Sequence, residues 1–373
     1  MLIGVPREIK PQEFRVGLTP ESVAELVHHG HEVLVETRAG AGIGALDEDY
    51  QAAGARIAAA AETVFLRSEL IVKVKEPQPT ERAWLHPDQT LFTYLHLAPD
   101  PELTRDLLAS GAVCIAYETV TDAQGGLPLL KPMSQVAGRL AIQAGAWALQ
   151  VGNGGRGLLP GGVPGVAPAR VLILGGGVVG FNAAQMAVGM QADVTILDRS
   201  PAVLERLATH FGAGARVLYA NRSVLAAELQ GADLVVGAVL VPGAATPRLV
   251  TRAHLAGMKP GAVLVDVAID QGGCCETSRP TTHAQPTFIL DGIVHYCVAN
   301  MPGAVPRTST YALNNATLPA VLALADKGWR TALVDDPHLR AGLNCCAGRV
   351  THPAVAAALG YDLTPAESLL GEG

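Results

Sequence analysis

Aromatic residues and charged residues are both scarce in this chain of 373 residues. Only 4% of the residues are aromatic, so the hydrophobic core must be built mainly from Ala, Val, Leu and Ile. Charged residues make up 16% and apolar residues 49%, which argues against an intrinsically disordered chain. Basic clusters are missing and the net charge is −7, so we expect neither nucleic acid nor an anionic membrane as a partner.

Recognisable cysteine patterns and membrane-spanning segments are lacking as well. The N-terminal residues have no apolar stretch like that of a signal peptide. Residues 171–192 carry no charge, but their five glycines predict a strand, a turn and a buried helix rather than a membrane span. No cysteine spacing or other motif requires a metal, and a reduced, cytoplasmic protein is expected. The six cysteines are Cys114, Cys274, Cys275, Cys297, Cys345 and Cys346.

The length of the chain predicts two domains, and the first 130 residues have the pattern of an α/β unit. Short apolar segments alternate with helical ones, which is typical of a parallel sheet covered by helices. Thr19 and Pro20 predict the start of the first helix, and Gly30 its end. A further helix is expected to begin after Ser134 and to run to about residue 151. Strands are predicted at residues 1–5, 32–35, 70–74, 91–94 and 113–116.

A second alternating series starts at Arg170 and suits a six-stranded doubly wound sheet. Ser200 and Pro201 predict the start of another helix, and Asp291-Gly292 predicts a tight turn. After residue 304 the pattern becomes helical again, and the last segment, residues 338–373, is expected to be a terminal helix. No internal repeat relates the two series. Strands are predicted at residues 170–174, 193–197, 216–219, 233–237, 262–267 and 294–299.

Residues 175–180 read GGGVVG and match the pattern G-x-G-x-x-G between a predicted strand and a predicted helix. In this pattern Gly175 permits the turn, and Gly177 lets the backbone approach a pyrophosphate. Gly180 lets the helix and the strand pack closely. The amide groups at the start of the helix favour the phosphate charge. The segment therefore predicts a Rossmann dinucleotide-binding domain, and the alternative is a tight turn that binds no nucleotide.

Asp198 ends the next predicted strand, where a carboxylate can accept hydrogen bonds from the adenosine ribose hydroxyls. A carboxylate at this position repels a 2′-phosphate, so NAD is favoured over NADP. Arg199 is a signal in the opposite direction, because an arginine there can accommodate that phosphate.

Several polar residues stand at or near the ends of predicted strands, where open α/β sheets bind their ligands. Alternation along the strand places Lys73 and Lys75 on one face. Lys73 is expected to be solvated, whereas Lys75 stands at the strand end before a proline. His96 also follows an apolar strand, although a single histidine there is more often structural.

Two carboxylates and one arginine complete the set of candidate residues. Asp266 and Asp270 interrupt an otherwise apolar segment, and a carboxylate there needs a partner or a solvated cleft. Arg15 lies among apolar residues near the N-terminus and could equally be a surface residue. None of these residues identifies a reaction by itself.

Longer matching segments give the chain a specific resemblance to the alanine dehydrogenase family, and the resemblance covers nearly the whole sequence. The family implies reversible oxidation of L-alanine by NAD and water to pyruvate, ammonium and NADH. The segments that carry the resemblance are residues 4–20, 72–77, 93–98, 132–141, 161–166, 265–274, 276–283 and 295–310.

The resemblance also implies roles for particular residues. Arg15 matches an arginine that binds the substrate carboxylate, and Lys75 a lysine that binds the substrate and polarises its carbonyl oxygen. His96 matches the general acid/base, a task suited to the near-neutral pKa of an unperturbed imidazole. Asp270 matches a carboxylate that orients the amine or the attacking water beside the nicotinamide.

The cofactor positions follow from the same resemblance. Val203 departs from the family, whose members often carry a basic residue there, and residues 219–221 lack a serine often found near the adenine. The matching positions are Ser134, Gly175, Gly177, Val178, Val179, Gly180, Asp198, Val239, Leu240, Val267, Ala268, Ile269, Asp270, Arg279, Val298, Ala299, Asn300 and Met301.

The family fold implies two doubly wound lobes. Residues 1–135 and 305–373 would form a discontinuous substrate domain with a flavodoxin-like or Rossmann-like parallel sheet, interrupted by a Rossmann NAD-binding domain at 136–304. Helical segments near 134–151 and 305–328 could cross between the lobes, and the substrate would bind in a cleft whose closure excludes water. A homo-hexamer is implied. Two alternatives remain: the NAD-binding subunit of a proton-translocating transhydrogenase, and a non-catalytic NAD-binding module.

Overall fold

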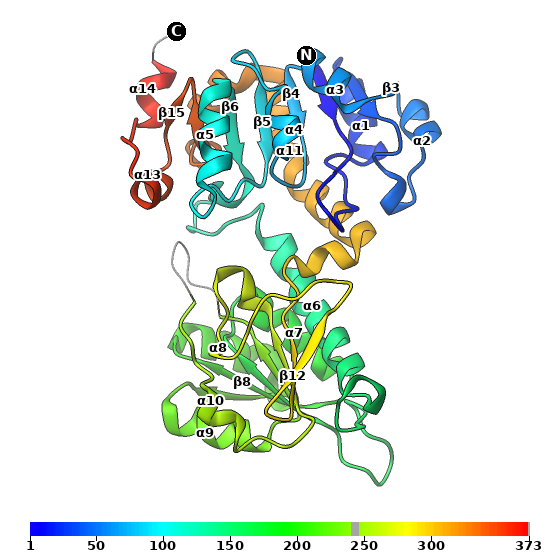
Figure 1. Cartoon of the computed structure of the whole chain (residues 1–373), viewed down its shortest axis with the longest axis vertical. Helices are drawn as coiled ribbons and strands as arrows, with labels where there is room; N and C mark the ends of the chain where they lie inside the picture. The colour runs from blue at the N-terminus through cyan, green and yellow to red at the C-terminus, as the bar shows by residue number, and fades with distance from the viewer. Residues whose placement is uncertain (240–245, 372–373) are drawn as a thin grey trace. The chain divides into compact units, whose positions relative to one another are not determined.

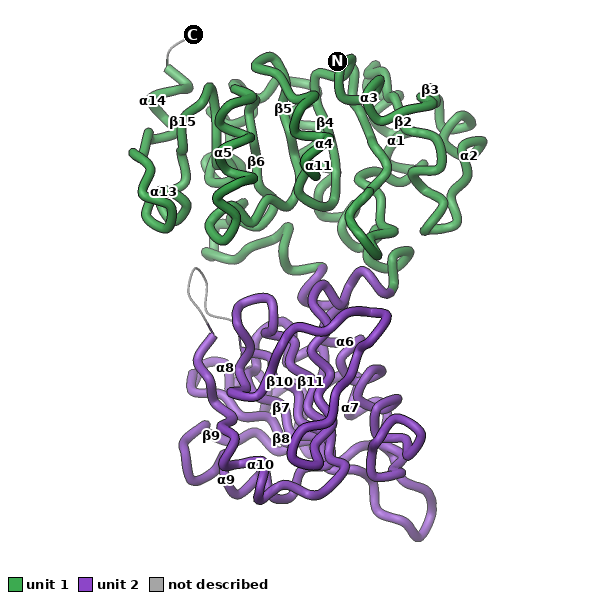
Figure 2. The backbone as a smooth tube through the Cα atoms, in the orientation of Figure 1, with its two compact units in different colours: residues 1–132, 305–373 green, residues 133–304 purple. Residues whose placement is uncertain are grey.

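The computed structural model describes residues 1–239 and 246–371 and shows an α/β architecture (Figure 1). The chain divides into two compact units (Figure 2). Unit 1 comprises residues 1–132 and 305–373, and unit 2 comprises residues 133–304. The chain enters unit 2 near the start of α6 (Lys131–Ala148) and returns to unit 1 just before α11 (Pro306–Asp335). The helix expected to begin after Ser134 therefore begins three residues earlier than Ser134, which lies in its first turn.

In its described residues, unit 1 contains an eight-stranded sheet. The strand order is β15-β14-β6-β5-β4-β1-β2-β3. Strands β1 to β6 are all parallel, and their order is that of a doubly wound Rossmann-like sheet. The six strands are β1 (Leu2–Val5), β2 (Glu32–Glu36), β3 (Arg56–Ala58), β4 (Leu70–Val72), β5 (Thr90–Thr93) and β6 (Val113–Ala116).

The C-terminal segment corrects the expectation of a terminal helix. It adds two antiparallel strands to one side of the sheet, β14 (Leu343–Cys346) and the edge strand β15 (Arg349–Val350), besides two short helices, α13 (Pro353–Leu359) and α14 (Ala366–Leu370). Ala347 and Gly348 join the strands with positive φ angles of 49° and 75°, as the mirror-image hairpin turns require. An Ala-Gly pair is a weak turn signal, which explains why the pattern did not reveal the hairpin.

Unit 2 contains a seven-stranded sheet among its described residues, with the order β12-β13-β11-β10-β7-β8-β9. All six predicted strands are present and parallel, as β7 (Arg170–Leu174), β8 (Asp193–Asp198), β9 (Arg216–Tyr219), β10 (Leu234–Gly237), β11 (Val263–Asp266) and β13 (Ile293–Tyr296). The predicted turn at Asp291-Gly292 joins β13 to an additional antiparallel edge strand, β12 (Thr287–Leu290). Both turn residues have positive φ angles, of 51° and 77°.

Local signals at the helix ends agree with the structure. Thr19 caps α1 (Pro20–His28) by accepting from the amide of Ser22, and Ser200 caps α8 (Pro201–Phe211) by accepting from the amide of Val203. Helix α11 is interrupted at Gly328, where the backbone leaves the helical region. The remaining helices are α2 (Asp47–Ala52), α3 (Ala61–Arg67), α4 (Pro79–Arg82), α5 (Pro101–Ser110), α7 (Val178–Gly189), α9 (Arg222–Gly231), α10 (Arg252–Leu255) and α12 (Pro337–Arg340).

The cores of both units consist largely of aliphatic side chains, as the scarcity of aromatics predicts. The uncharged segment 171–192 forms β7, a turn and α7, in agreement with the sequence analysis. None of the helices in the described residues is long and apolar enough to cross a membrane.

Candidate functional site

The glycine loop between β7 and α7 has the geometry that a pyrophosphate site needs. Gly175 has a φ of 98°, in the region that favours glycine, and a Cβ at Gly180 would overlap the carbonyl oxygen of Gly175. A Cβ at Gly177, in contrast, would meet nothing within 4 Å. The loop therefore packs tightly against its strand and leaves open space beside Gly177, at the N-terminus of α7, where Val178 and Val179 follow.

Asp198 stands at the end of β8 and is tied to the same loop. Its Oδ2 accepts from the amide of Gly176 at 2.7 Å, and its Oδ1 from the amide of Ser200 at 2.8 Å. The Nη2 of Arg206 donates to the carbonyl of Gly176 at 2.9 Å, so the amide and the carbonyl of Gly176 are both held by ionic side chains. Arg199, the residue that could favour NADP, is exposed.

The other predicted cofactor positions of unit 2 also follow the carboxyl ends of neighbouring strands. Val239 follows β10, and Leu240 lies outside the described residues. Val267, Ala268, Ile269 and Asp270 form a 3-10 turn, η5 (Val267–Gln271), directly after β11. Val298, Ala299, Asn300 and Met301 follow β13, where Asn300 has a φ of 59° and the backbone of Val298 bridges to Thr281.

Two predicted cofactor residues come from other elements. Ser134 lies on α6, whose Gly138 packs so closely on the start of α7 that a Cβ there would overlap the carbonyl of Val179. Arg279 is exposed, and its guanidinium lies 4.4 Å from the ring centre of Phe288. The structure thus gathers most of the predicted cofactor positions around β7, β10, β11 and β13, and it places Arg279 against Phe288 of β12.

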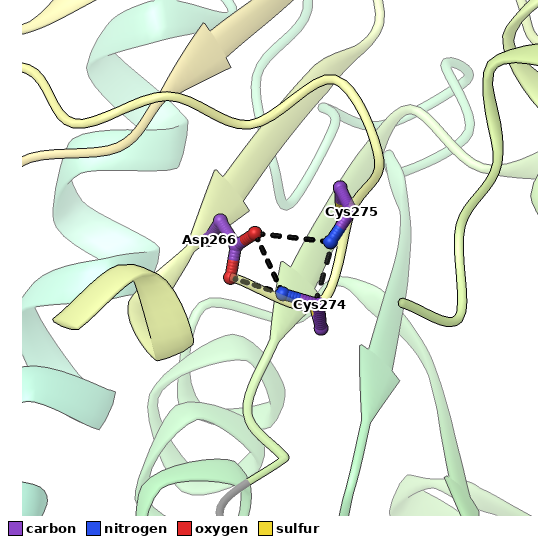
Figure 3. A group of neighbouring side chains, drawn as sticks. All are labelled: Asp266, Cys274 and Cys275. Atoms are coloured by element: carbon purple, nitrogen blue, oxygen red, sulfur yellow. Dashed lines mark hydrogen bonds between the residues drawn. The ribbon is translucent and has the colours of Figure 1, made fainter. Parts of the chain in front are cut away.

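A buried group with possible metal-ligating atoms lies at the end of β11. The side chains of Asp266, Cys274 and Cys275 offer donors within 4.8 Å of one another in the described part of the chain (Figure 3). The carboxylate of Asp266 already accepts hydrogen bonds from the backbone amides of both cysteines. Hydrogen bonding to the following loop therefore accounts for this group.

The candidate residues of unit 1 lie at the carboxyl ends of four adjacent strands. Arg15 follows β1, Lys75 follows β4, His96 follows β5 and Glu118 follows β6. Strands β1 and β4 are neighbours at which the strand order reverses, the position where doubly wound sheets bind ligands.

Arg15 is buried, with 2% of its surface exposed, rather than on the surface. Its Nε and Nη2 each donate to a carboxylate oxygen of Glu13 at 2.7 Å, which forms a bidentate ion pair. Burial alone would lower the pKa of Arg15, but the hydrogen bonds and the charge of Glu13 outweigh it and raise the pKa. Burial also raises the pKa of Tyr94, and the charge of Arg15 opposes that rise.

Lys73 contradicts the expectation of a solvated residue, because it is fully buried. Its ammonium group contacts Glu81 at 2.8 Å and Glu8 at 3.2 Å. Burial alone would lower the pKa of Lys73, but the two carboxylates outweigh it and raise the pKa. Glu8 also accepts from the amides of Val74 at 2.7 Å and Lys75 at 3.2 Å, so this buried ion network fixes the backbone that carries Lys75.

His96 has a strained backbone, with a φ of 51°, and a side chain that is 48% exposed. Glu118 accepts from the amide of His96 at 2.6 Å, and its carboxylate lies 3.8 Å from Nδ1 of His96. The imidazole stacks parallel to Tyr94, with ring centres 5.9 Å apart. Glu118 and Glu13 were missed by the sequence analysis. For Glu118 a signal was available, an acidic residue shortly after a buried strand.

Each unit gathers its own set of candidate residues. Arg15, Lys75 and His96 lie at the carboxyl ends of the unit 1 strands, whereas Asp270 and the glycine loop belong to unit 2.

The chain matches the profiles described as "Alanine dehydrogenase/PNT, N-terminal domain" at residues 4–137 and "Alanine dehydrogenase/PNT, C-terminal domain" at residues 141–353.

The chain belongs to the alanine dehydrogenase/PNT family.

Individual members of the family are similar to the chain over its whole length. It is 59% identical to an alanine dehydrogenase of Halomonas elongata over 100% of both chains. It is 53% identical to one of Bacillus subtilis, over 99% of this chain and 98% of that one. A solved structure entitled L-alanine dehydrogenase has a TM-score of 0.94 at 53% identity and covers 96% of this chain and 99% of its own. A transhydrogenase structure from Sinorhizobium meliloti, at 24% identity and a TM-score of 0.80, covers 95% of this chain and 100% of its own and shares the fold.

Membership of the alanine dehydrogenase/PNT family implies a nicotinamide dinucleotide cofactor. The glycine loop fits such a group, because a Cβ at Gly177 would meet nothing within 4 Å, at the N-terminus of α7. Asp198, held by two backbone amides, stands at the strand end where a ribose is bound in such folds.

Proposed function

We propose that this protein catalyses the NAD-dependent oxidative deamination of L-alanine to pyruvate and ammonium, and the reverse reductive amination. One observation carries the proposal: full-length relatives that are 51–59% identical are named alanine dehydrogenases. The buried Arg15 and the strand-end positions of Lys75 and His96 agree with it.

The proposed reaction converts L-alanine, NAD⁺ and water into pyruvate, ammonium, NADH and a proton. Nicotinamide dinucleotide, when bound, accepts the hydride from Cα of alanine. The carboxylate of alanine binds Arg15, whose Nε and Nη2 also donate to Glu13. Lys75 contacts the oxygen atom that becomes the pyruvate carbonyl.

Proton transfers accompany the addition of water to the imino acid and the release of ammonia. His96 is the proposed general base for this water and the proposed acid for the departing amine. Glu118 holds its backbone, and Tyr94 stacks on the ring, so the imidazole is held in one orientation. Asp270 orients the amine or the water, and its charge stabilises the positive charge that develops there.

We propose NAD rather than NADP as the preferred dinucleotide. The carboxylate of Asp198 lies next to the glycine loop, where it would accept from ribose hydroxyls and repel a 2′-phosphate. The remaining predicted cofactor positions at the ends of β10, β11 and β13 would bind the rest of the dinucleotide. In this proposal residues 136–304 are the NAD-binding domain, and residues 1–135 with 305–373 are the substrate domain.

We also propose that the protein forms a homo-oligomer, with the hexamer as the expected state, and that it is located in the cytoplasm. Support for self-association comes from exposed apolar residues of unit 2. Val163 and Val166 are 50% and 60% exposed, and Ile289 on the edge strand β12 is 60% exposed. All six cysteines are free and buried, which suits a reducing compartment. Light scattering after gel filtration would determine the oligomeric state.

The two alternative functions are less well supported. The transhydrogenase structure is only 24% identical and supports the shared fold alone. A binding module without catalysis would not need a buried arginine, a lysine and a histidine at adjacent strand ends.

Steady-state oxidation of L-alanine, followed by the absorbance of NADH, tests the proposal directly. The expected result is turnover with NAD that is much faster than with NADP, and little turnover with D-alanine. Tight binding of NADH without turnover of alanine or pyruvate would favour a binding module and overturn the proposal.

A further inference from the structure

Asp266 is a fully buried carboxylate at the end of β11, and within the described residues its hydrogen bonds go to the loop that follows. A buried charge without such bonds would be strongly destabilising. The donors around the carboxylate of Asp266 therefore compensate the cost of its burial. Oδ1 accepts from the amides of Ala268 at 3.2 Å and Cys274 at 3.2 Å, and Oδ2 from the amides of Cys274 at 3.0 Å and Cys275 at 3.2 Å and from the hydroxyl of Ser278 at 2.6 Å.

The loop reaches back to Asp266 because two consecutive glycines reverse its direction. Gly272 and Gly273 have φ angles of 92° and 79°, which side chains rarely adopt. A Cβ at Gly273 would lie 2.8 Å from Oδ2 of Asp266. On the neighbouring strand, a Cβ at Gly237 would lie 3.1 Å from Oδ1 and overlap the thiol of Cys274. The carboxylate therefore fills a space that is closed on both sides.

The same loop carries residues with proposed functions. Asp270 lies four residues after Asp266 in η5, and Arg279 directly follows Ser278. The side chain of Asp270 is exposed, so the backbone of the loop determines where its carboxylate stands. Figure 3 shows Asp266 facing the backbone nitrogens of Cys274 and Cys275 at the far end of this loop.

We propose that Asp266 is a positioning residue for the reaction: its carboxylate fixes the loop 267–278 and thereby places Asp270 and the backbone beside the nicotinamide. This inference rests on the proposed function. The group of Asp266 with Cys274 and Cys275 acts as a hydrogen-bonded anchor rather than as a metal site. The carboxylate oxygens of Asp266 are occupied by N–H and O–H donors from the loop.

The substitution Asp266→Asn isolates this role. An amide has one acceptor oxygen and one NH₂ group, so its NH₂ must face backbone N–H donors whichever way the side chain is turned. The loop must then shift, and a displacement of about 1 Å at a reacting group can cost about 100-fold in rate. We expect kcat for L-alanine to fall by about that factor.

The control is another buried carboxylate of unit 2, at the opposite end of its sheet. Asp233 accepts from the amide of Arg170 at 2.9 Å and pairs with Lys259 at 2.8 Å, and it is 4% exposed. It directly precedes β10, far along the strand from the loop after β11. Asp233→Asn should therefore lower stability without lowering turnover. Ser278→Ala, which removes a single donor to Asp266, is the milder second variant.

The experiment measures kcat per NADH-binding site, affinity for ADP-ribose, and the fluorescence of bound NADH in wild type and the three variants. We expect Asp266→Asn to lose turnover per site and to change the fluorescence of the bound nicotinamide, while its affinity for ADP-ribose is kept. Ser278→Ala should show a smaller change in the same direction, and it remains informative if Asp266→Asn does not fold.

Three results would overturn the inference. Wild-type turnover per site and wild-type fluorescence in Asp266→Asn would show that the loop does not depend on this carboxylate. An equal loss of turnover per site in Asp233→Asn would show a general effect of destabilisation. Stoichiometric zinc that is lost from Asp266→Asn would assign a metal site. If the wild type does not oxidise alanine, the proposed function fails instead. The role of Asp266 is then still decided by whether Asp266→Asn changes the fluorescence of bound NADH while it keeps its affinity for ADP-ribose.

Discussion

The buried ion network around Lys73 allows a quantitative test of how unit 1 is held together. Lys73→Met replaces the ammonium group by an apolar side chain of similar length and leaves Glu8 and Glu81 buried without their cation. Removing one partner of a buried ion pair costs about 3–5 kcal/mol. For a unit of this size, each kcal/mol lowers the melting temperature by about 2–4 °C, so we expect a decrease of about 6–20 °C.

The same variant should be sensitive to pH, because the carboxyl group of Glu8 remains buried. Burial raises the pKa of Glu8, and the charge of Lys73 opposes the rise, so Lys73→Met should raise the pKa further. A carboxyl whose pKa is raised by folding adds stability below its unfolded pKa of 4.5 and loses it as the pH rises through the folded value. The variant should therefore lose more stability at about pH 8 than at about pH 5.

Thermal unfolding followed by circular dichroism at both pH values measures the effect. The matched control is Lys327→Met, also in unit 1, which removes an ammonium group that is 48% exposed and lies 2.7 Å from Asp335. Such a surface pair is worth at most about 1 kcal/mol. If Lys73→Met melts at the same temperature as the control, or if its loss is the same at both pH values, the reasoning about the buried network is refuted.

Three further predictions concern the proposed active site. His96→Ala should lower kcat about 100- to 10,000-fold while NADH still binds in a fluorescence titration, and near-normal turnover would show a structural role only. Asp198→Ala should lower the ratio of kcat/KM with NAD to kcat/KM with NADP. An unchanged ratio would exclude the proposed contact of Asp198 with the ribose. Arg15→Ala should raise KM for alanine and for pyruvate, because the contact of Arg15 with the carboxylate exists in both substrate and product. Asp270→Asn should lower kcat with little change in KM, because the charge of Asp270 acts mainly in the transition state. Unchanged KM values for Arg15→Ala would move the carboxylate site to Lys75.

Local signals predicted much of the fold correctly. The caps at Thr19 and Ser200, the turn at Asp291-Gly292 and the glycine loop each depend on a few consecutive residues, so the sequence pattern contains the information. The doubly wound order of both sheets follows from the alternation of strands and helices. The hairpin of β14 and β15 was missed because Ala347-Gly348 is a weak turn signal and because β14 pairs with β6, which lies more than two hundred residues earlier in the chain.

Only those residues of the site that stand at predicted strand ends or match the family resemblance could be predicted from the sequence. The burial of Lys73 could not be predicted, because its partners Glu8 and Glu81 come from the loop after β1 and from α4. Likewise, nothing in the pattern shows that Glu13 pairs with Arg15, since the pairing depends on how the loop after β1 folds. The folding of the loops, together with the contact of Lys73 with Glu8, 65 residues away, decides these ion pairs, and periodicity does not encode them.

The most direct test of the proposed function is the fate of the hydrogen on Cα of alanine. Wild-type protein would be mixed with NAD and L-alanine deuterated at Cα, and the products would be identified by mass spectrometry and by assays for ammonium and pyruvate. The proposal predicts deuterated NADH, pyruvate and ammonium in equal amounts. Absence of deuterium from NADH, or NADH formed without pyruvate and ammonium, would contradict it.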